Sequence, residues 1–286
     1  MKRNYGPYYV APITIWLGLF FVIPISIIVY YSFLRRGLTG GVIHEFSLAA
    51  YASLNNPTFF TIALNTLTVA VVSTLIMVGL AIPAAYYMAR SRYKNFFLLL
   101  VIVPFLTNFL IRIYAWMAIL GNNGILNNIL LATGITSEHI QFLYNTNAVI
   151  LVTAYTYLPF AILPLYSTIE KFDFSLIEAA RDLGASKFMA TLRILLPNIK
   201  GGITTAVLFT FIPAFGNYAI PNIIGGTNSY MLGNVIAREL TVTRNWPLAS
   251  SISVVLTVLT TVGVLIFMRL NKSAMESDRE TKGARS

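Results

Sequence analysis

The sequence predicts an all-α membrane protein with six transmembrane helices. Of its 286 residues, 57% are hydrophobic and only 10% are charged, whereas soluble domains carry about 25% charged residues. A helix needs about 20 consecutive apolar residues to cross the hydrocarbon core of a bilayer. Runs of that length occur at residues 11–33, 59–89, 96–120, 147–169, 201–224 and 248–270. We therefore expect one transmembrane domain over residues 1–286, with a polar tail at 275–286.

The first three runs are separated by one long loop and one short one. Lys2 and Arg3 precede the first run as they would in a signal peptide, but the run is longer than such a segment and no small-residue cleavage site follows it. We interpret residues 11–33 as a retained first helix. A long loop at residues 34–58 leads to the second run, and a short basic connection leads to the third.

The loop after the third run, residues 121–146, contains an apolar stretch at 124–131. This stretch is too short to span a bilayer, which favours a helix lying at the membrane surface. The fourth and fifth runs are joined by the connection at residues 170–200, and a polar segment leads to the sixth. Proline lies inside five of the six runs and should kink those helices, which suits a bundle that rearranges.

The distribution of Lys and Arg predicts the orientation, because basic residues are retained on the cytoplasmic side. If the N-terminus is inside, fifteen of the 20 basic residues fall on that face, four fall on the other, and Arg112 lies within the third run. Both termini and residues 170–200 are therefore expected in the cytoplasm. The net charge of +10 does not indicate nucleic-acid binding, since the charges lie between apolar runs instead of on one soluble face.

The sequence contains no motif that predicts enzyme chemistry or a bound cofactor or metal. It has no Gly-x-x-x-x-Gly-Lys-Ser/Thr phosphate loop, no cysteine and no cluster of histidine with carboxylates. All ten acidic residues fall outside the apolar runs. Transporters driven by protons or sodium commonly use intramembrane carboxylates, so a secondary transporter is the less favoured alternative.

The connection at residues 170–200 predicts a short amphipathic helix. Ser175 and Glu178 have capping-box spacing, and Gly184 can end the helix in a left-handed conformation. Four apolar residues then share one face: Leu176, Ala179, Ala180 and Leu183. Such a helix can lie on lipid, or it can insert into a groove of a partner protein.

Residues 178–186 read Glu-Ala-Ala-Arg-Asp-Leu-Gly-Ala-Ser, and residues 194–197 read Ile-Leu-Leu-Pro. In residue type and spacing they resemble the EAA loop of binding-protein-dependent ABC importer permeases. The resemblance implies the type I importer permease fold in a bacterial inner membrane. It also implies a second permease subunit, two ATPase subunits that bind ATP and Mg, and an extracytoplasmic binding protein. In that family this helix docks into the ATPase, which implicates Glu178, Ala179, Ala180, Arg181, Asp182, Leu183 and Gly184.

Further segments resemble spermidine/putrescine permeases: residues 108–116, 122–124, 212–218, 220–222 and 245–250. Polyamines are polycations, which aromatic faces attract by cation–π contact. The expected substrate path comprises Arg112, Tyr114, Trp116, Phe211, Phe215, Asn217, Tyr218, Asn222 and Trp246.

Other interpretations of these residues stay open. The aromatic residues can instead form an interface belt. Arg112 has the wrong sign for a polycation site and can instead cap backbone carbonyls or extend toward the membrane surface. Another small solute, such as iron, sulfate or an amino-acid derivative, is the alternative substrate. The second permease can be a copy of this chain or a related one.

Overall fold

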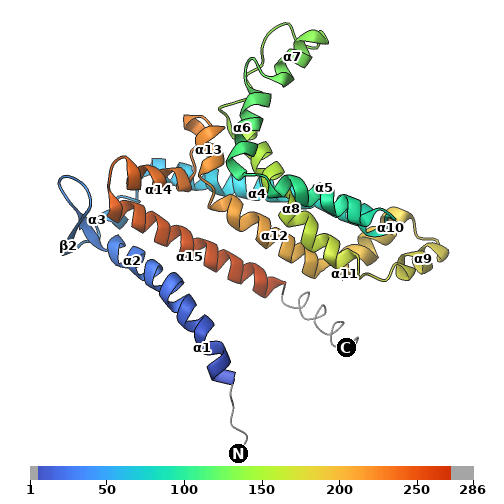
Figure 1. Cartoon of the computed structure of the whole chain (residues 1–286), viewed down its shortest axis with the longest axis horizontal. Coiled ribbons are helices and arrows are strands. Elements are labelled where there is room, and N and C mark those ends of the chain that lie inside the picture. Colours follow the sequence, from blue (N-terminus) through green and yellow to red (C-terminus); the bar gives the residue numbers. More distant parts are fainter. Residues whose placement is uncertain (1–5, 272–286) are drawn as a thin grey trace, which may run out of the picture. The chain divides into compact units, whose positions relative to one another are not determined.

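The computed structural model describes residues 6–271, so the predicted tail at 275–286 lies outside it. Within these residues the regular secondary structure is helical apart from one two-stranded hairpin (Figure 1). Five described helices are long and apolar enough to cross a membrane, or six if one bent pair counts as a single span. The described residues divide into two compact units, one of residues 6–63 and 232–260, the other of residues 64–231 and 261–271.

The first unit begins with an apolar helical span, Tyr9–Ser32, whose most apolar window has no buried residue. The helical stretch that contains this span comprises α1 (Gly6–Leu17), a π-helical turn η1 (Gly18–Val22) and α2 (Ile23–Ser32). Pro24 follows the π-helical turn closely. Because proline lacks an N–H and clashes with the carbonyl four residues earlier, the wider turn accommodates it without ending the helix.

A hairpin follows, in which β1 (Leu34–Arg36) pairs antiparallel with β2 (Val42–Phe46). It is tied to the chain between α14 (Leu232–Thr241) and α15 (Trp246–Leu270). Arg36 Nη2 donates to the carbonyl of Thr243 at 2.9 Å, and the Gly41 amide donates to the carbonyl of Arg244 at 2.8 Å. The short helix α3 (Ala49–Ala52) completes this part of the unit.

The second unit is built around α8 (Thr146–Ile169) and α12 (Lys200–Phe215), which pack closely together. A Cβ atom at Gly202 would lie 2.8 Å from Thr168 Cβ, so glycine allows this close approach. From Leu64 onward, α4 (Pro57–Arg90) also belongs to this unit. Buried residues form two clusters, one including Leu165, Ile169 and Ile199, the other including Val149, Ile220 and Ile224.

The prediction of one continuous helix at 96–120 is wrong, because the structure has two. Helix α5 (Lys94–Leu106) ends where Thr107 is extended, and α6 (Phe109–Leu120) begins after it. Asn108 Oδ1 accepts hydrogen bonds from the amides of Leu110 and Ile111 at 2.9 and 3.4 Å, which caps the new helix. The apolar stretch predicted at 124–131 forms helix α7 (Ile125–Ala132).

The predicted helix at 201–224 is also interrupted. Helix α12 ends at Phe215, and α13 (Ala219–Ile223) is separate, followed by the 3-10 turn η3 (Thr227–Ser229). Before α12, the chain forms α10 (Lys187–Ala190), the π-helical turn η2 (Thr191–Leu195) and α11 (Leu196–Asn198). This segment meets α12 at a bend of 72°. As in the first span, the π-helical turn ends two residues before a proline, here Pro197.

Candidate functional site

The predicted amphipathic helix in the connection at 170–200 is present as α9 (Ser175–Asp182), but the predicted capping box is absent. Phe174 occupies the N-cap position and supplies no side-chain hydrogen bond. Instead, Asp173 Oδ1 accepts a hydrogen bond from the Ser175 amide at 3.0 Å. An Asp side chain that bonds the amide two residues later is a common turn-forming device, so Asp173 organises the entry to α9.

One face of α9 is buried in the core and the other is exposed on the surface. Ile177 is only 3% exposed and joins the core cluster of α8 and its neighbours, with Ala180 packed against the same cluster. Three of the four residues of the predicted apolar face point away from the core: Ala179 is exposed, Leu176 is 46% exposed and Leu183 is 89% exposed. Exposed leucines beside alanines form a surface that a partner can cover.

The helix ends as the sequence predicts, in a left-handed glycine. Gly184 has φ +92°. Its amide donates to the carbonyl of Arg181 at 2.9 Å, and the Ala185 amide donates to the carbonyl of Ala180 at 3.0 Å. These bonds form a Schellman motif. Ser186 then caps α10 by accepting from the Met189 amide at 3.2 Å, so the chain reverses within a few residues.

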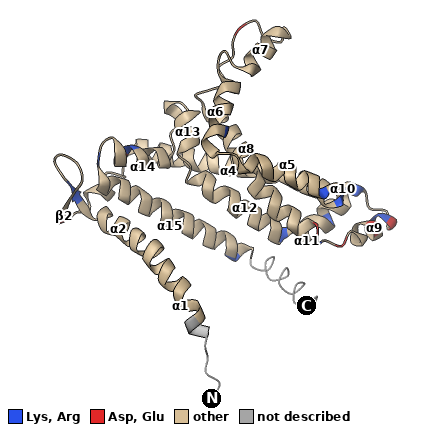
Figure 2. Ribbon diagram, viewed as in Figure 1, with Lys and Arg blue, Asp and Glu red and all other residues tan. Residues whose placement is uncertain are grey.

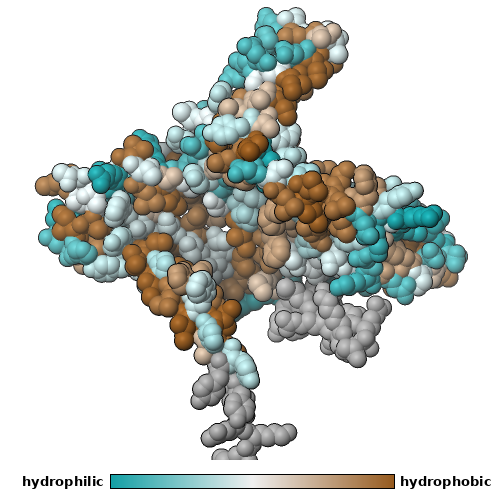
Figure 3. Space-filling view, in the orientation of Figure 1, coloured by the Kyte–Doolittle hydropathy of each residue, from teal (hydrophilic) through white to brown (hydrophobic). Residues whose placement is uncertain are grey.

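Charged residues surround this turn. Residues of α9 and the turn line a depression of about 480 Å³, among them Glu178, Arg181, Asp182 and Lys187. In the second unit, Lys, Arg, Asp and Glu gather at the end that carries α9 and α10 (Figure 2). Hydrophobic residues instead cover the surface around α5 (Figure 3). This distribution is typical of a membrane protein whose polar end lies beyond the bilayer.

A network of polar side chains, which the sequence reasoning missed, holds the end of α8 to α5. Lys94 Nζ lies 2.8 Å from Glu170 Oε1, and the Tyr166 hydroxyl donates to the same oxygen at 2.8 Å. The hydrogen bond from Lys94, reinforced by that from Tyr166, holds the pKa of the Glu170 carboxyl below its usual value. No sequence motif joins Lys94 to Glu170, because 76 positions separate them.

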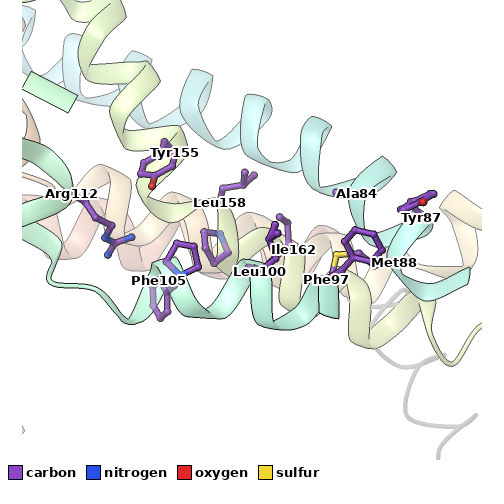
Figure 4. Close-up of a pocket in the computed structure, with 13 residues that line it drawn as sticks. Ala84, Tyr87, Met88, Phe97, Leu100, Phe105, Arg112, Tyr155, Leu158 and Ile162 are labelled. Carbon is purple, nitrogen blue, oxygen red and sulfur yellow. The ribbon is translucent and has the colours of Figure 1, made fainter. Parts of the chain in front are cut away.

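Arg112 lies at the edge of an apolar pocket between α4, α5, α6 and α8 (Figure 4). The pocket has a volume of about 460 Å³. Arg112 Nη1 donates to the carbonyl of Thr156 at 3.4 Å, and its guanidinium carbon lies 5.6 Å from the centre of the Phe105 ring. These contacts agree with the interpretation that Arg112 caps a backbone carbonyl.

The other predicted path residues have different surroundings in the described chain. The ring of Trp116 packs edge-on against that of Tyr155, with ring centres 5.2 Å apart, and the ring of Phe211 stacks on that of Phe215, with centres 5.4 Å apart. Asn217 is buried, and its Oδ1 accepts from the Ile220 amide at 3.3 Å. Four predicted residues are exposed: Tyr114, Tyr218, Asn222 and Trp246. Trp246 belongs to the other unit, where it stacks on Tyr31 at 6.2 Å. Their role in a substrate path stays a prediction.

The sequence of residues 77–274 matches the protein family described as binding-protein-dependent transport system inner membrane component. The chain is 39% identical over 265 residues to the spermidine/putrescine transport system permease protein PotB of Haemophilus influenzae, covering 92% of this chain and 93% of that protein. It is 38% identical over 259 residues to PotB of Escherichia coli, covering 90% and 94% of the two chains.

The fold is similar to that of a solved bacterial alginate ABC transporter in complex with an alginate pentasaccharide-bound periplasmic protein. The TM-score is 0.78 over 96% of both chains, at 18% sequence identity. At that identity the likeness concerns the fold alone. The all-α fold predicted from the sequence therefore has the architecture of that solved transporter chain.

Proposed function

Because this chain belongs to the family of binding-protein-dependent transport system inner membrane components, we propose that it is the permease subunit of an ATP-driven polyamine importer in a bacterial inner membrane. The observation that carries the substrate class is the 38–39% identity to two spermidine/putrescine permeases, which extends over at least nine-tenths of this chain. Iron, sulfate and amino-acid derivatives are the competing substrates that an experiment must exclude.

The complete transporter would contain a second permease subunit, two ATPase subunits that bind ATP and Mg, and an extracytoplasmic binding protein. This assembly is supported by the absence of a phosphate-binding loop from the sequence and by the exposed apolar face of α9. Leu176, Ala179 and Leu183 would enter a groove of the ATPase, while Glu178, Arg181 and Asp182 would meet polar groups at its rim. Closure of the ATPase pair would then move α9.

The aromatic residues are proposed to guide the polycation, and the binding protein would select it. No Asp or Glu lies in the helices of the described chain that could cross a membrane. Recognition within these helices would therefore rest on cation–π and polar contacts, each of about 0.5–2 kcal/mol. Weak contacts suit a path, since tight binding would slow release of the substrate.

The orientation is proposed from the distribution of Lys and Arg, with both termini and α9 in the cytoplasm. The chain has no cysteine, so single cysteines can be introduced without background. In intact cells, a membrane-impermeant thiol reagent should label Asn123→Cys, in the outer loop before α7, and leave Ser186→Cys unlabelled until the cells are opened. Both positions are exposed. The opposite labelling pattern would reverse the proposed orientation.

The substrate class is tested by uptake in cells that lack their own polyamine transporters. The chain would be expressed with its ATPase, second permease and binding protein, and uptake of labelled spermidine and putrescine would be measured. We expect saturable uptake that unlabelled polyamines compete with and that sulfate, ferric iron and amino acids leave unchanged. Uptake of one of these competitors in place of polyamines would refute the substrate and leave the permease assignment intact.

A further inference from the structure

Phe174, at the start of α9, lies against the last turn of α4. The guanidinium carbon of Arg90, the final residue of α4, is 5.2 Å from the centre of the Phe174 ring and 6.0 Å from that of Tyr86. Arg90 Nη1 donates to the Tyr86 hydroxyl at 3.1 Å. The rings of Tyr86 and Phe174 meet edge to face, with centres 5.9 Å apart. Each of these three side chains thus contacts the other two.

We infer that Tyr86, Arg90 and Phe174 form a clamp that makes α4 move with α9, so that these side chains pass the movement of the ATPase to the membrane helices. They are positioning residues: none of them belongs to the exposed face of α9 that would contact the ATPase, so they act by holding α9 in place. The inference rests on the proposed function, in which α9 docks on an ATPase. It adds the route by which a movement of α9 reaches α4.

The construction of α9 makes such a clamp necessary. The helix has eight residues, and helices that short are unstable without tertiary contacts. Its hydrophobic anchor is Ile177, which packs in the core cluster. Apolar contacts are not directional, so the packing of Ile177 and Ala180 does not by itself fix the rotation of α9. The Arg90 guanidinium has two defined partners, the Tyr86 hydroxyl at 3.1 Å and the Phe174 ring with its centre 5.2 Å away. A hydrogen bond and a cation–π contact both depend on direction as well as distance.

A second connection links the same region to α5. The Lys94, Glu170 and Tyr166 network joins the first residue of α5 to the last turn of α8. Phe174 follows Glu170 by four residues, so both connections hold the short segment that leads into α9. A movement of α9 would therefore reach α4 directly through the clamp and α5 through Glu170.

The test compares variants of Phe174 in the complete transporter with its ATPase, second permease and binding protein. Phe174→Leu keeps an apolar side chain but removes the ring, whereas Phe174→Trp keeps a strong cation–π acceptor. Phe172→Leu is the matched control. The Phe172 ring packs edge-on against Phe174 at 5.3 Å, and it is the rings of Phe174 and Tyr86 that Arg90 faces.

The first measurement is spermidine taken up per ATP hydrolysed. Phe174→Leu should lower this ratio about two- to fivefold, the factor that corresponds to one exposed cation–π contact. Phe174→Trp should keep the ratio of uptake to hydrolysis near that of the original protein. Phe172→Leu should also leave this ratio near the original value, even if the protein becomes less stable. A ratio unchanged in Phe174→Leu, or lowered equally in Phe172→Leu, would overturn the inference.

The second measurement does not depend on the substrate. Spin labels at Tyr87→Cys on α4 and Ser175→Cys on α9 report the distance between the two helices, and both positions are exposed. With the clamp intact the distance distribution should stay the same when ATP binds, while in Phe174→Leu it should broaden or shift. A distance that changes with ATP in the original protein would refute the clamp. If the original transporter does not take up polyamines but the distance between the two labels stays the same when ATP binds, the proposed substrate is wrong and the clamp is still supported.

Discussion

Substitution of Gly184 tests whether the left-handed turn after α9 is required for coupling. Its φ is +92°, and a Cβ atom built there would have no heavy atom within 4 Å. Added bulk therefore meets open space, and the cost of a side chain comes from the backbone conformation. For a β-branched residue this cost is about 1–3 kcal/mol, whereas Asn tolerates positive φ. At about 2 kcal/mol, Val would weaken the native turn about thirtyfold relative to Gly.

The series Gly184→Asn, Gly184→Ala and Gly184→Val should therefore cause increasing damage in that order. The Ala185 amide bonds the carbonyl of Ala180 across this turn, so its hydrogen exchange should accelerate in the same order. Association with the ATPase and polyamine uptake should fall in parallel. If Gly184→Asn were as harmful as Gly184→Val, the partner would be sensing the side chain and not the backbone. Normal coupling in Gly184→Val would refute the proposed role of the turn.

Three other predictions follow from named contacts. Ile177→Ala should destabilise the protein by about 2–5 kcal/mol, measured by thermal unfolding in detergent, because Ile177 is 3% exposed in the core; an unchanged unfolding temperature would contradict this. Glu170→Gln should lower the unfolding temperature at neutral pH. Because the pKa of Glu170 is lowered in the folded protein, its ionised carboxylate stabilises the fold above the ordinary value of 4.5, and this stabilisation is lost as pH falls through the lowered pKa. The difference in unfolding temperature between Glu170→Gln and the original protein should therefore shrink in acid. A difference that grows in acid would contradict this prediction. Tyr218→Ala should reduce uptake and leave stability unchanged, because Tyr218 is 52% exposed; unchanged uptake would remove Tyr218 from the path.

Much of the architecture could be predicted from the sequence because a bilayer demands long apolar runs, and these are visible without any knowledge of packing. The interruptions were harder to predict. The break between α5 and α6 depends on the Asn108 side chain turning back to cap a helix inside an apolar stretch, a local choice that hydropathy does not record. The π-helical turns before Pro24 and Pro197 likewise change the hydrogen-bond pattern without changing composition.

At α9 the sequence predicted the helix, its C-terminal glycine and the EAA motif, yet it indicated the wrong capping residue. Ser175 and Asp173 both carry oxygens suited to a helix start, and the structure uses Asp173. The burial of Ile177 was not predicted, because α9 carries apolar residues on both sides and only tertiary packing decides which of them the core covers. The clamp of Arg90 on Phe174 joins positions 84 residues apart and leaves no local pattern.

The central claim is that α9 couples this permease to an ATPase during polyamine import. The measurement that tests it most directly is spermidine uptake into proteoliposomes that contain the complete transporter, for the original chain, Leu183→Met and Leu183→Asp. Leu183 is 89% exposed, so neither substitution should disturb folding. We predict uptake that requires ATP and the binding protein, persists in Leu183→Met, and is lost in Leu183→Asp together with ATPase association. Undiminished uptake in Leu183→Asp, or the absence of ATP-dependent uptake by the original transporter, would contradict the account.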